Sequence, residues 1–438
     1  MTSRLKFAVI GLGQCGGNLA NAFAKYGYPS MAINTSILDL KDLANIPDNR
    51  KIHTPLNDTD GAGKDPRIGE KALYSHLPSI LAGIQQFVSG ADAILITAGL
   101  GGGTGSNISL LGNMMKKFGL PIVVLATIPT NDESALAKIN ALRAVNRIVS
   151  ENFDSCIIVD NAKILSQFPD SSLAGFYPEA NEYVVRTFTN FNSLTSEFAS
   201  RCLISFDNED FRKVLLSKGI LIFGETELAS NQINTLDDIL PRLREIWQTS
   251  GLMAEGFNVA TAASGAISIF APSAILQKTS SRFLNLLGEE FKSLTNGATC
   301  YFGLYEMPNS SNIKISTMLG RLTIPMRLQE MLTEASSEGK NLNAKLQQEL
   351  PTLDISALDN MELFAQGPAP RDGQGSDTHI LAREAAAASA ATMQAAYSTE
   401  ISKGSRDAAL SSDDSTDEAR SYSLEEYVKI KKLKTSTT

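Results

Sequence analysis

The sequence predicts an α/β protein, in which a doubly wound parallel sheet forms the first domain and a smaller α+β domain follows. Over residues 1–177, short apolar runs alternate with segments of helical periodicity, which is the pattern of a parallel sheet with crossover helices. Two of the apolar runs end in glycine-rich turns. The predicted strands lie near residues 5–10, 30–34, 93–98, 121–127 and 156–160. Loops at the carboxyl ends of such strands form a ligand crevice.

The remainder of the chain divides into further parts. We expect a long central helix over 178–204, with Pro178 at a first helical position, and a second domain over 205–325. Apolar strands of this second domain are predicted near 219–223, 264–270, 298–305 and 312–318. A C-terminal helical segment over 326–364 and a flexible tail over 365–438 complete the chain.

The tail combines few aromatic residues with many small and charged ones, and such a mixture buries too little apolar surface to fold alone. It contains an acidic patch at 411–418 and a basic end at 427–434. One interpretation is a flexible linker. The other is a short hook for a binding partner, made by the lysines that lie beside apolar residues in the basic end.

The charge and the cysteine pattern limit the classes of function. The formal net charge is −8 at pH 7, so we do not expect the folded body to bind DNA directly. The four cysteines, Cys15, Cys156, Cys202 and Cys300, have no disulfide or metal-site spacing. No apolar run is long enough to span a bilayer. We therefore expect a cytoplasmic protein without membrane contacts.

The stretch Leu95–Ser106 is the strongest single motif. A buried strand leads into Gly99-Leu-Gly-Gly-Gly-Thr-Gly-Ser106, and a helical pattern starts at Ile108. The free N–H groups of a first helical turn and the positive end of its dipole point at one spot, where glycine lets phosphate oxygens come close. This loop therefore predicts an anion site.

A second glycine-rich loop follows the first strand. Gly11, Gly13 and Gly16 satisfy the dinucleotide fingerprint G-x-G-x-x-G in its strand–turn–helix setting, so a dinucleotide-dependent oxidoreductase is an alternative. That class also needs an acid at the end of the next strand, whereas residues 33–36 are Ile-Asn-Thr-Ser. No P-loop motif G-x-x-x-x-G-K-[ST] occurs in the sequence. Two phosphate loops without these partners indicate another kind of nucleotide fold.

These motifs resemble the tubulin/FtsZ superfamily over roughly the first 320 residues. Gly-Gly-Gly-Thr-Gly-Ser at 101–106 resembles its signature, and Gly-Gln-Cys-Gly at 13–16 looks like the tubulin form of its first loop. The segments 61–69, 158–165 and 206–211 resemble the third phosphate loop, the base-reading loop and the catalytic loop in the family's order. Asp160-Asn-Ala-Lys163 and the long tail are most similar to TubZ, the plasmid- and phage-borne branch.

The resemblance implies GTP and GDP as ligands, with Mg²⁺ held mainly by phosphates and water. It assigns phosphate contacts to the residues of three loops: Gly13, Gln14, Cys15, Gly16, Asn18, Gly61, Ala62, Gly63, Gly101, Gly102, Gly103, Thr104, Gly105 and Ser106. It assigns the base, the ribose and a further nucleotide contact to Asn34, Glu133, Asn161, Tyr177 and Asn181, with the Tyr177 ring stacked on the base. One departure is Ala137, because the FtsZ branch has arginine there.

The resemblance also implies that catalysis is shared between subunits. Asp207 and Asp210, at spacing i, i+3, match two acids that the family projects into the nucleotide pocket of the next subunit, where they position and polarise the attacking water. Ser205 stands where the family has a further asparagine. Without the resemblance, two acids at this spacing are also typical of a helix N-cap.

The function implied is that of a head-to-tail polymer. A pocket at one end and acids at the other complete the site only in a contact that does not close, which generates a filament. We expect a GTP-dependent, filament-forming GTPase that moves plasmid or phage DNA, with a DNA-bound adaptor recruited by the tail. The first alternative is an FtsZ-like division protein or another cytoskeletal GTPase; the oxidoreductase is the second.

Overall fold

The computed structural model describes residues 4–56, 59–170, 172, 175–194, 202–249, 253–307 and 310–346. The predicted tail over 365–438 and the end of the predicted helical segment lie outside these residues. Within the described part, none of the helices combines the length and the hydropathy of a transmembrane span.

The first half of the structure is a six-stranded parallel arrangement in the order β3-β2-β1-β4-β5-β6. Its strands are β1 (Phe7–Leu12), β2 (Ser30–Asn34), β3 (Lys51–His53), β4 (Ala93–Gly99), β5 (Ile122–Ile128) and β6 (Ser155–Asp160). The predicted parallel sheet is confirmed. The direction of strand order reverses between β1 and β4, and this is where a doubly wound sheet opens a crevice.

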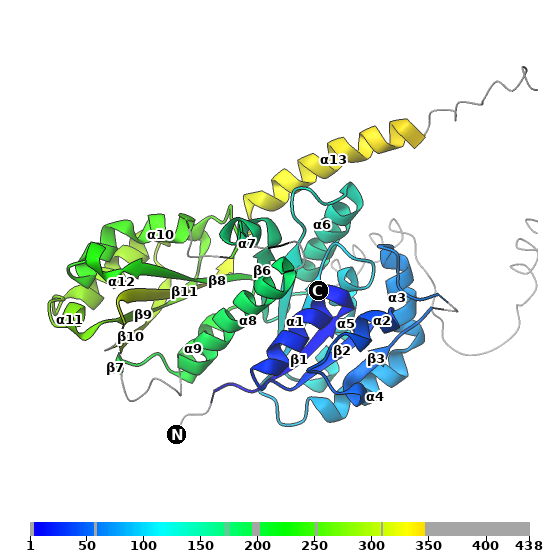
Figure 1. Cartoon of the computed structure of the whole chain (residues 1–438), viewed down its shortest axis with the longest axis horizontal. Helices are drawn as coiled ribbons and strands as arrows, with labels where there is room; N and C mark the ends of the chain where they lie inside the picture. The colour runs from blue at the N-terminus through cyan, green and yellow to red at the C-terminus, as the bar shows by residue number, and fades with distance from the viewer. Residues whose placement is uncertain are drawn as a thin grey trace, which may run out of the picture. The chain divides into compact units, whose positions relative to one another are not determined.

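Helices cover both faces of this sheet (Figure 1). They are α1 (Gly13–Lys25), α2 (Ile37–Lys41), α3 (Pro66–Ser75), α4 (Leu77–Phe87), α5 (Ile108–Met115), α6 (Ala135–Ser150), α7 (Asn161–Gln167) and α8 (Phe176–Leu194). Alternate residues of β1 enter two different cores, because side chains of a strand point to opposite faces. Ile10 packs in the core that contains α4, α5 and α6, and Val9 packs in the core that contains α1 and α8.

The sheet continues into the second half as β6-β8-β11-β9-β10-β7. These strands are β7 (Cys202–Ile204), β8 (Ile220–Ala229), β9 (Ser264–Ala271), β10 (Thr299–Glu306) and β11 (Asn312–Leu322). The helices are α9 (Asn208–Leu215), α10 (Leu243–Thr249), α11 (Ser273–Leu276), α12 (Phe283–Leu294) and α13 (Met326–Leu346). The two halves join through two residue pairs between β6 and β8, Cys156 with Ile220 and Ile157 with Leu221.

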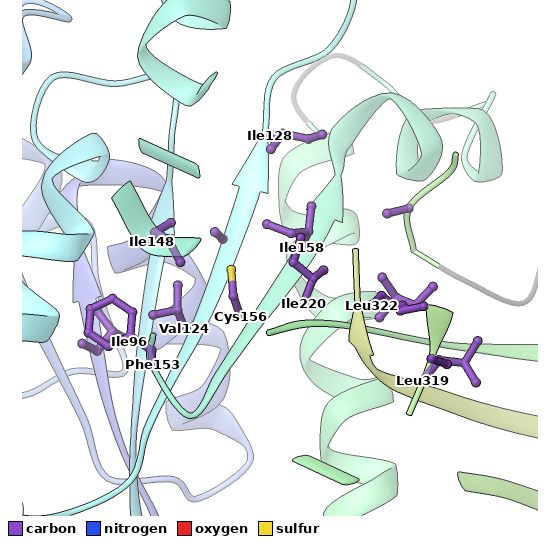
Figure 2. Close-up of a cluster of buried hydrophobic side chains, with 14 of the residues drawn as sticks. Ile96, Val124, Ile128, Ile148, Phe153, Cys156, Ile158, Ile220, Leu319 and Leu322 are labelled. Atoms are coloured by element: carbon purple, nitrogen blue, oxygen red, sulfur yellow. The ribbon is translucent and has the colours of Figure 1, made fainter. Parts of the chain in front are cut away.

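The hydrophobic core runs across this narrow junction. Figure 2 shows Ile158, Ile220 and Leu322 side by side, with Cys156 and Val124 continuing the cluster on one side and Leu319 on the other. Burial of each such side chain stabilises the fold by about 1.5–3 kcal/mol. The apolar packing therefore joins the two halves more extensively than the strand pairing does.

The prediction of one helix over 178–204 is wrong at both ends. Helix α8 begins at Phe176 and is described to Leu194, and Cys202–Ile204 form strand β7. The reason is the free edge of β10, since Leu304 pairs with Ile204 and Tyr305 with Cys202. Strand pairing of this kind overrides helical spacing read along one segment.

Candidate functional site

A cavity of ≈ 650 Å³ lies at the point where the strand order reverses, at the carboxyl ends of β1, β2, β4, β5 and β6. Every residue predicted to contact nucleotide lines it except Gly16 and Ser106. The predicted residues that line it are Gly13, Gln14, Cys15, Asn18, Asn34, Gly61, Ala62, Gly63, Gly101, Gly102, Gly103, Thr104, Gly105, Glu133, Asn161, Tyr177 and Asn181. The fold thus brings seven separate segments of the chain to one place.

The first loop presents the start of α1 to the cavity. Leu12, the N-cap residue, makes no side-chain cap, and the first turn holds no acid, so its N–H groups remain for a ligand. Gly16 itself does not line the cavity. A Cβ there would lie 2.1 Å from the Thr97 carbonyl oxygen, and the Thr97 hydroxyl donates to the Gly16 carbonyl at 2.8 Å. Gly16 is glycine because α1 packs closely on β4.

The glycine-rich loop after β4 curls back on itself. A Cβ at Gly105 would lie 2.3 Å from the Gly99 carbonyl oxygen, whereas a Cβ at Gly102 would meet no atom within 4 Å. The Thr104 and Thr35 hydroxyls hydrogen-bond each other at 2.8 Å, so one of their two protons remains for a ligand. Ser106 instead donates to the Gly103 carbonyl at 3.2 Å and lines a neighbouring cavity.

The third loop is held against the other two. The Gly61 N–H donates to the Thr35 carbonyl at 3.0 Å, and a Cβ at Gly103 would lie 2.8 Å from the Ala62 Cβ. The Asn140 amide on α6 donates to the carbonyls of both Lys64 and Gly101, at 2.9 and 3.2 Å. Residues 61–64 are therefore fixed beside the glycine-rich loop at the mouth of the cavity.

The opposite end of the cavity is formed by side chains that suit a base and a ribose. Tyr177 and Asn181 are one turn apart on α8 and share a face. Burial, reinforced by the charge of Glu133, raises the pKa of Tyr177. Burial also raises the pKa of Cys15, whose sulfur lies 3.4 Å from the Thr127 hydroxyl. Asn161 opens α7, next to the N-cap residue of that helix.

The side chains around the cavity carry little positive charge. Among the described lining residues, Lys64 is the cation and Asp39 and Glu133 are the anions. Asp39 was not predicted, and it accepts from the amides of Gln14 at 3.2 Å and Asn34 at 2.9 Å. Asp39 lies in the first turn of the short helix after β2. The cavity therefore has a carboxylate near the end of β2, although residues 33–36 include no acid.

Ala137, at the position where the FtsZ branch has arginine, does not line the cavity. Ala137 is fully buried beneath the glycine-rich loop, and a Cβ at Gly101 would lie 3.2 Å from the Ala137 Cβ. Lys64 is the described lining residue that can supply a positive charge instead.

Asp207 and Asp210 do not line the cavity of their own chain; they form a capping box at the start of α9. The Asp210 N–H donates to Asp207 Oδ1 at 2.8 Å, and the Asp207 N–H donates to Asp210 Oδ2 at 3.4 Å. Burial, together with the charge of Asp207, raises the pKa of Asp210. In Figure 1, α9 lies toward the lower side of the folded unit and α6 toward the upper side.

Helix α13 anchors the side of the cavity that Asn161 lines, and the sequence did not predict this contact. The Arg327 guanidinium on α13 hydrogen-bonds the Asn131 side chain and lies 3.7 Å from the Asp160 carboxylate. Asp160 accepts from the Ala162 N–H at 2.9 Å and so caps α7. Asn131 belongs to the loop that contains Glu133. One arginine thus joins two of the loops that line the cavity.

Helix α13 is also tied to the helix behind the phosphate loops. The Lys138 ammonium on α6, in a side chain only 2% exposed, lies 2.8 Å from Glu338 and 3.2 Å from Glu334 of α13. Asn140 on the same helix holds Gly101 and Lys64. The last described helix is therefore connected to both ends of the cavity.

Comparison with known proteins identifies the family. Residues 6–169 match the Tubulin/FtsZ family GTPase domain, and residues 190–332 match the C-terminal domain of Tubulin/FtsZ-like proteins of the TubZ-like kind. The tubulin-like protein TubZ of Bacillus cereus is 31% identical over 249 residues, which cover 53% of this chain and 57% of that relative. The matched part thus spans little more than half the length of TubZ.

Two further proteins resemble the chain over more of its length. The tubulin-like protein CetZ of Pyrococcus furiosus is 26% identical over 372 residues, which cover 80% of this chain and 97% of CetZ. A structure of GDP-form protofilaments of Bacillus thuringiensis TubZ has a TM-score of 0.68 and 19% identity, covering 79% of this chain and 94% of that one. This last likeness establishes the fold.

These matches decide against the dinucleotide-dependent oxidoreductase, although Asp39 lies near the end of the second strand. They also confirm the predicted GTPase class at the level of the domain family. The chain belongs to the tubulin/FtsZ family, with a GTPase domain followed by a TubZ-like C-terminal domain.

Proposed function

We propose that this protein binds GTP, polymerises head to tail, and hydrolyses GTP at the contact between subunits. The observation that carries the proposal is that the acids of α9 do not line the cavity of their own chain. An active site assembled from opposite ends of two copies requires a heterologous contact, and such a contact generates a filament when it does not close.

The phosphate-binding loops support a triphosphate as the ligand. Backbone N–H groups of α1 and of the glycine-rich loop converge on a cavity in which a Cβ at Gly102 would meet only open space. Backbone dipoles of this kind hold phosphates at helix N-termini. Lys64 is outnumbered by Asp39 and Glu133, so Mg²⁺ held by the phosphates and water would supply the positive charge that the described lining lacks.

The acids of the neighbouring subunit provide the hydrolytic groups in this proposal. Asp207 and Asp210 orient a water for in-line attack on the γ-phosphorus and accept its proton, and inorganic phosphate and GDP leave. The raised pKa of Asp210 brings this carboxylate closer to neutral pH as a proton acceptor. Loss of the γ-phosphate removes the contacts that residues 61–63 make with it and weakens the contact between subunits.

The test is light scattering with phosphate release on the purified full chain, with GTP or ATP and Mg²⁺. Asp207→Asn is the informative variant, because asparagine retains the N-cap of α9 and removes the carboxylate, whereas Asp207→Ala also removes the cap, at a cost of about 1 kcal/mol. We expect GTP-specific assembly of both proteins, with phosphate release only from the wild type. Equal hydrolysis by dilute, unassembled protein and by the variant would contradict a shared site.

We further propose that the filament moves plasmid or phage DNA in the cytoplasm, through a DNA-bound adaptor that the basic end at 427–434 recruits. The TubZ-like C-terminal domain and the TubZ relative support this role. The basic charge of the segment supports a partner with an acidic surface.

A second candidate keeps the GTPase and changes its cellular task to an FtsZ-like or other cytoskeletal role. The observation in its favour is the match to CetZ over 97% of that protein's length. Co-purification of the filament with a DNA-bound adaptor would support segregation. Filaments whose position in the cell depends on cell shape, with no adaptor or DNA bound to them, would support the cytoskeletal role.

A further inference from the structure

A second cavity of ≈ 400 Å³ adjoins the first and shares Gly63 and Lys64 with it. One side is the third loop with Arg67, and the other is a face of α6. Leu136, Asn140, Arg143 and Arg147 of α6 lie at i, i+4, i+7 and i+11, so they share one face of the helix. Apart from Gly63 and Lys64, the residues that line this cavity have no part in the binding of GTP described above.

Four cations and two acids line this cavity, so its positive charge is only partly neutralised: Lys64, Arg67, Arg143 and Arg147, with Asp65 and Glu70. The Arg67 guanidinium donates twice to Asp65, at 3.1 and 2.8 Å. Arg143 and Arg147 are exposed and form no ion pair or hydrogen bond through their side chains with another residue in the part of the chain that the structure describes. Like charges at i, i+4 weaken a helix by a few tenths of a kcal/mol.

The helix that carries the arginines is held in place before any partner binds. Ala137 and Ala144 of α6 are buried in the domain, and Asn140 fastens the helix to the carbonyls of Lys64 and Gly101. On its other side Lys138 pairs with α13. A rigid surface of this kind loses little conformational entropy when a partner docks.

The other end of the molecule offers a matching surface. Leu203 and Ile204 of β7 are 62% and 37% exposed, and the first turn of α9 beside them is acidic. Asp207 and Asp210 are engaged in the capping box, whereas Glu209 is exposed and forms no ion pair with a described residue. Across the contact, Leu136 at the basic cavity is 47% exposed.

We propose that the second cavity receives Glu209 from a second copy of this chain, in an ion pair with Arg143 and Arg147. The inference rests on the proposed head-to-tail polymer and deepens it. The two cavities share residues 63 and 64, so an acid in the same helical turn as Asp207 and Asp210 is close to the second cavity when those two enter the first. Leu136 then packs near Leu203 and Ile204.

The consequence is a contact with two separate parts. Nucleotide and the two aspartates form the part that hydrolysis changes, and the Glu209 pair forms a part that stays the same in the GTP and GDP states. Opposite charges on the two surfaces also steer the approaching subunit and fix its register.

The test is a charge swap in the full-length protein. We expect Glu209→Arg alone, and Arg143→Glu with Arg147→Glu alone, each to raise the concentration needed for GTP-driven assembly about tenfold or more. The chain that carries all three changes should recover assembly. GTP affinity, measured by equilibrium binding below the assembly concentration, should stay at the wild-type value in every variant. Arg244→Glu on α10 is the matched control, with an exposed arginine outside both surfaces, and it should assemble like the wild type.

Two results would overturn the inference while leaving the proposed polymer intact. One is that Glu209→Arg and the double arginine variant each assemble like the wild type. The other is that the triple variant assembles as poorly as either of them. A wild-type chain that binds GTP without assembling would overturn the polymer and the ion pair together.

Discussion

At the scale of single residues, a substitution at Gly102 should affect nucleotide binding and leave the stability of the fold unchanged. A methyl group there meets no protein atom within 4 Å, and Gly102 lines the cavity proposed to hold phosphate. We expect Gly102→Ala to leave the melting temperature unchanged and to lower GTP affinity at least about tenfold, measured by calorimetry. Gly105→Ala is the contrast, because its Cβ would lie 2.3 Å from the Gly99 carbonyl oxygen and should destabilise the fold. An unchanged GTP affinity in Gly102→Ala would show that the loop does not hold phosphate.

Asp160 gives a prediction about pH. Burial raises the pKa of its carboxyl, by more than the Ala162 N–H and Arg327 lower it. The ionised form is thus disfavoured in the fold, so the contribution of this group to stability is present below its unfolded pKa of about 3.9 and is lost as the pH rises through the folded pKa. Asp160→Asn keeps the cap of α7 and does not titrate. Urea unfolding should show the variant gaining stability over the wild type as the pH rises from about 4 to about 7; a difference that stays constant with pH would contradict the shift.

The sequence identified most residues around the cavity because their function requires glycines and polar groups at fixed places after strands. It could not identify Gly16 as a packing glycine, because the fingerprint does not show which carbonyl lies against it. Arg327 was missed because its partners, Asn131 and Asp160, are far away in the sequence and meet it only in the folded chain. Asp39 was missed because it follows the strand end by a short helical turn.

At the scale of elements, the attachment of α13 to α6 depends on an asymmetric ion pair. Lys138 is buried, whereas the side chains of Glu334 and Glu338 are 35% and 43% exposed. Glu334→Gln with Glu338→Gln leaves a buried ammonium without an anion and should destabilise the protein by about 2 kcal/mol, below the range for a fully buried pair because both acids reach solvent. Lys138→Met removes the buried charge and should cost less. Urea unfolding measures both variants, and a larger loss in Lys138→Met would contradict this account.

The sequence predicted elements best where one segment determines its own structure. Strands β1, β2, β4, β5 and β6 are apolar runs that are buried on both faces, so the pattern alone identifies them. Strand β3 has only Lys51-Ile-His53 and is a strand because it pairs with β2. Strand β7 likewise depends on the edge of β10. Elements that a neighbour creates cannot be read from their own residues.

At the scale of the whole molecule, the proposed filament and its cargo should be separable. Deleting residues 425–438 removes the basic end and none of the described residues, so GTP-driven assembly should be unchanged and capture of the adaptor–DNA complex should be lost. Co-sedimentation of that complex with filaments measures both properties at once. Capture by the truncated filament at the wild-type level would exclude the tail hook.

The phosphate cradle proposed above, made of backbone N–H groups, has a consequence for how the protein responds to ionic strength. Its dipoles act on phosphate at direct contact, with Lys64 as the described cation of the lining, so dissolved ions screen the interaction little. Exposed charges such as Arg143 and Arg147 are screened beyond a Debye length of about 8 Å at physiological ionic strength. Added potassium chloride should therefore dissolve filaments while the subunits keep their nucleotide. Lowering the salt concentration at constant protein concentration should let the same subunits assemble again.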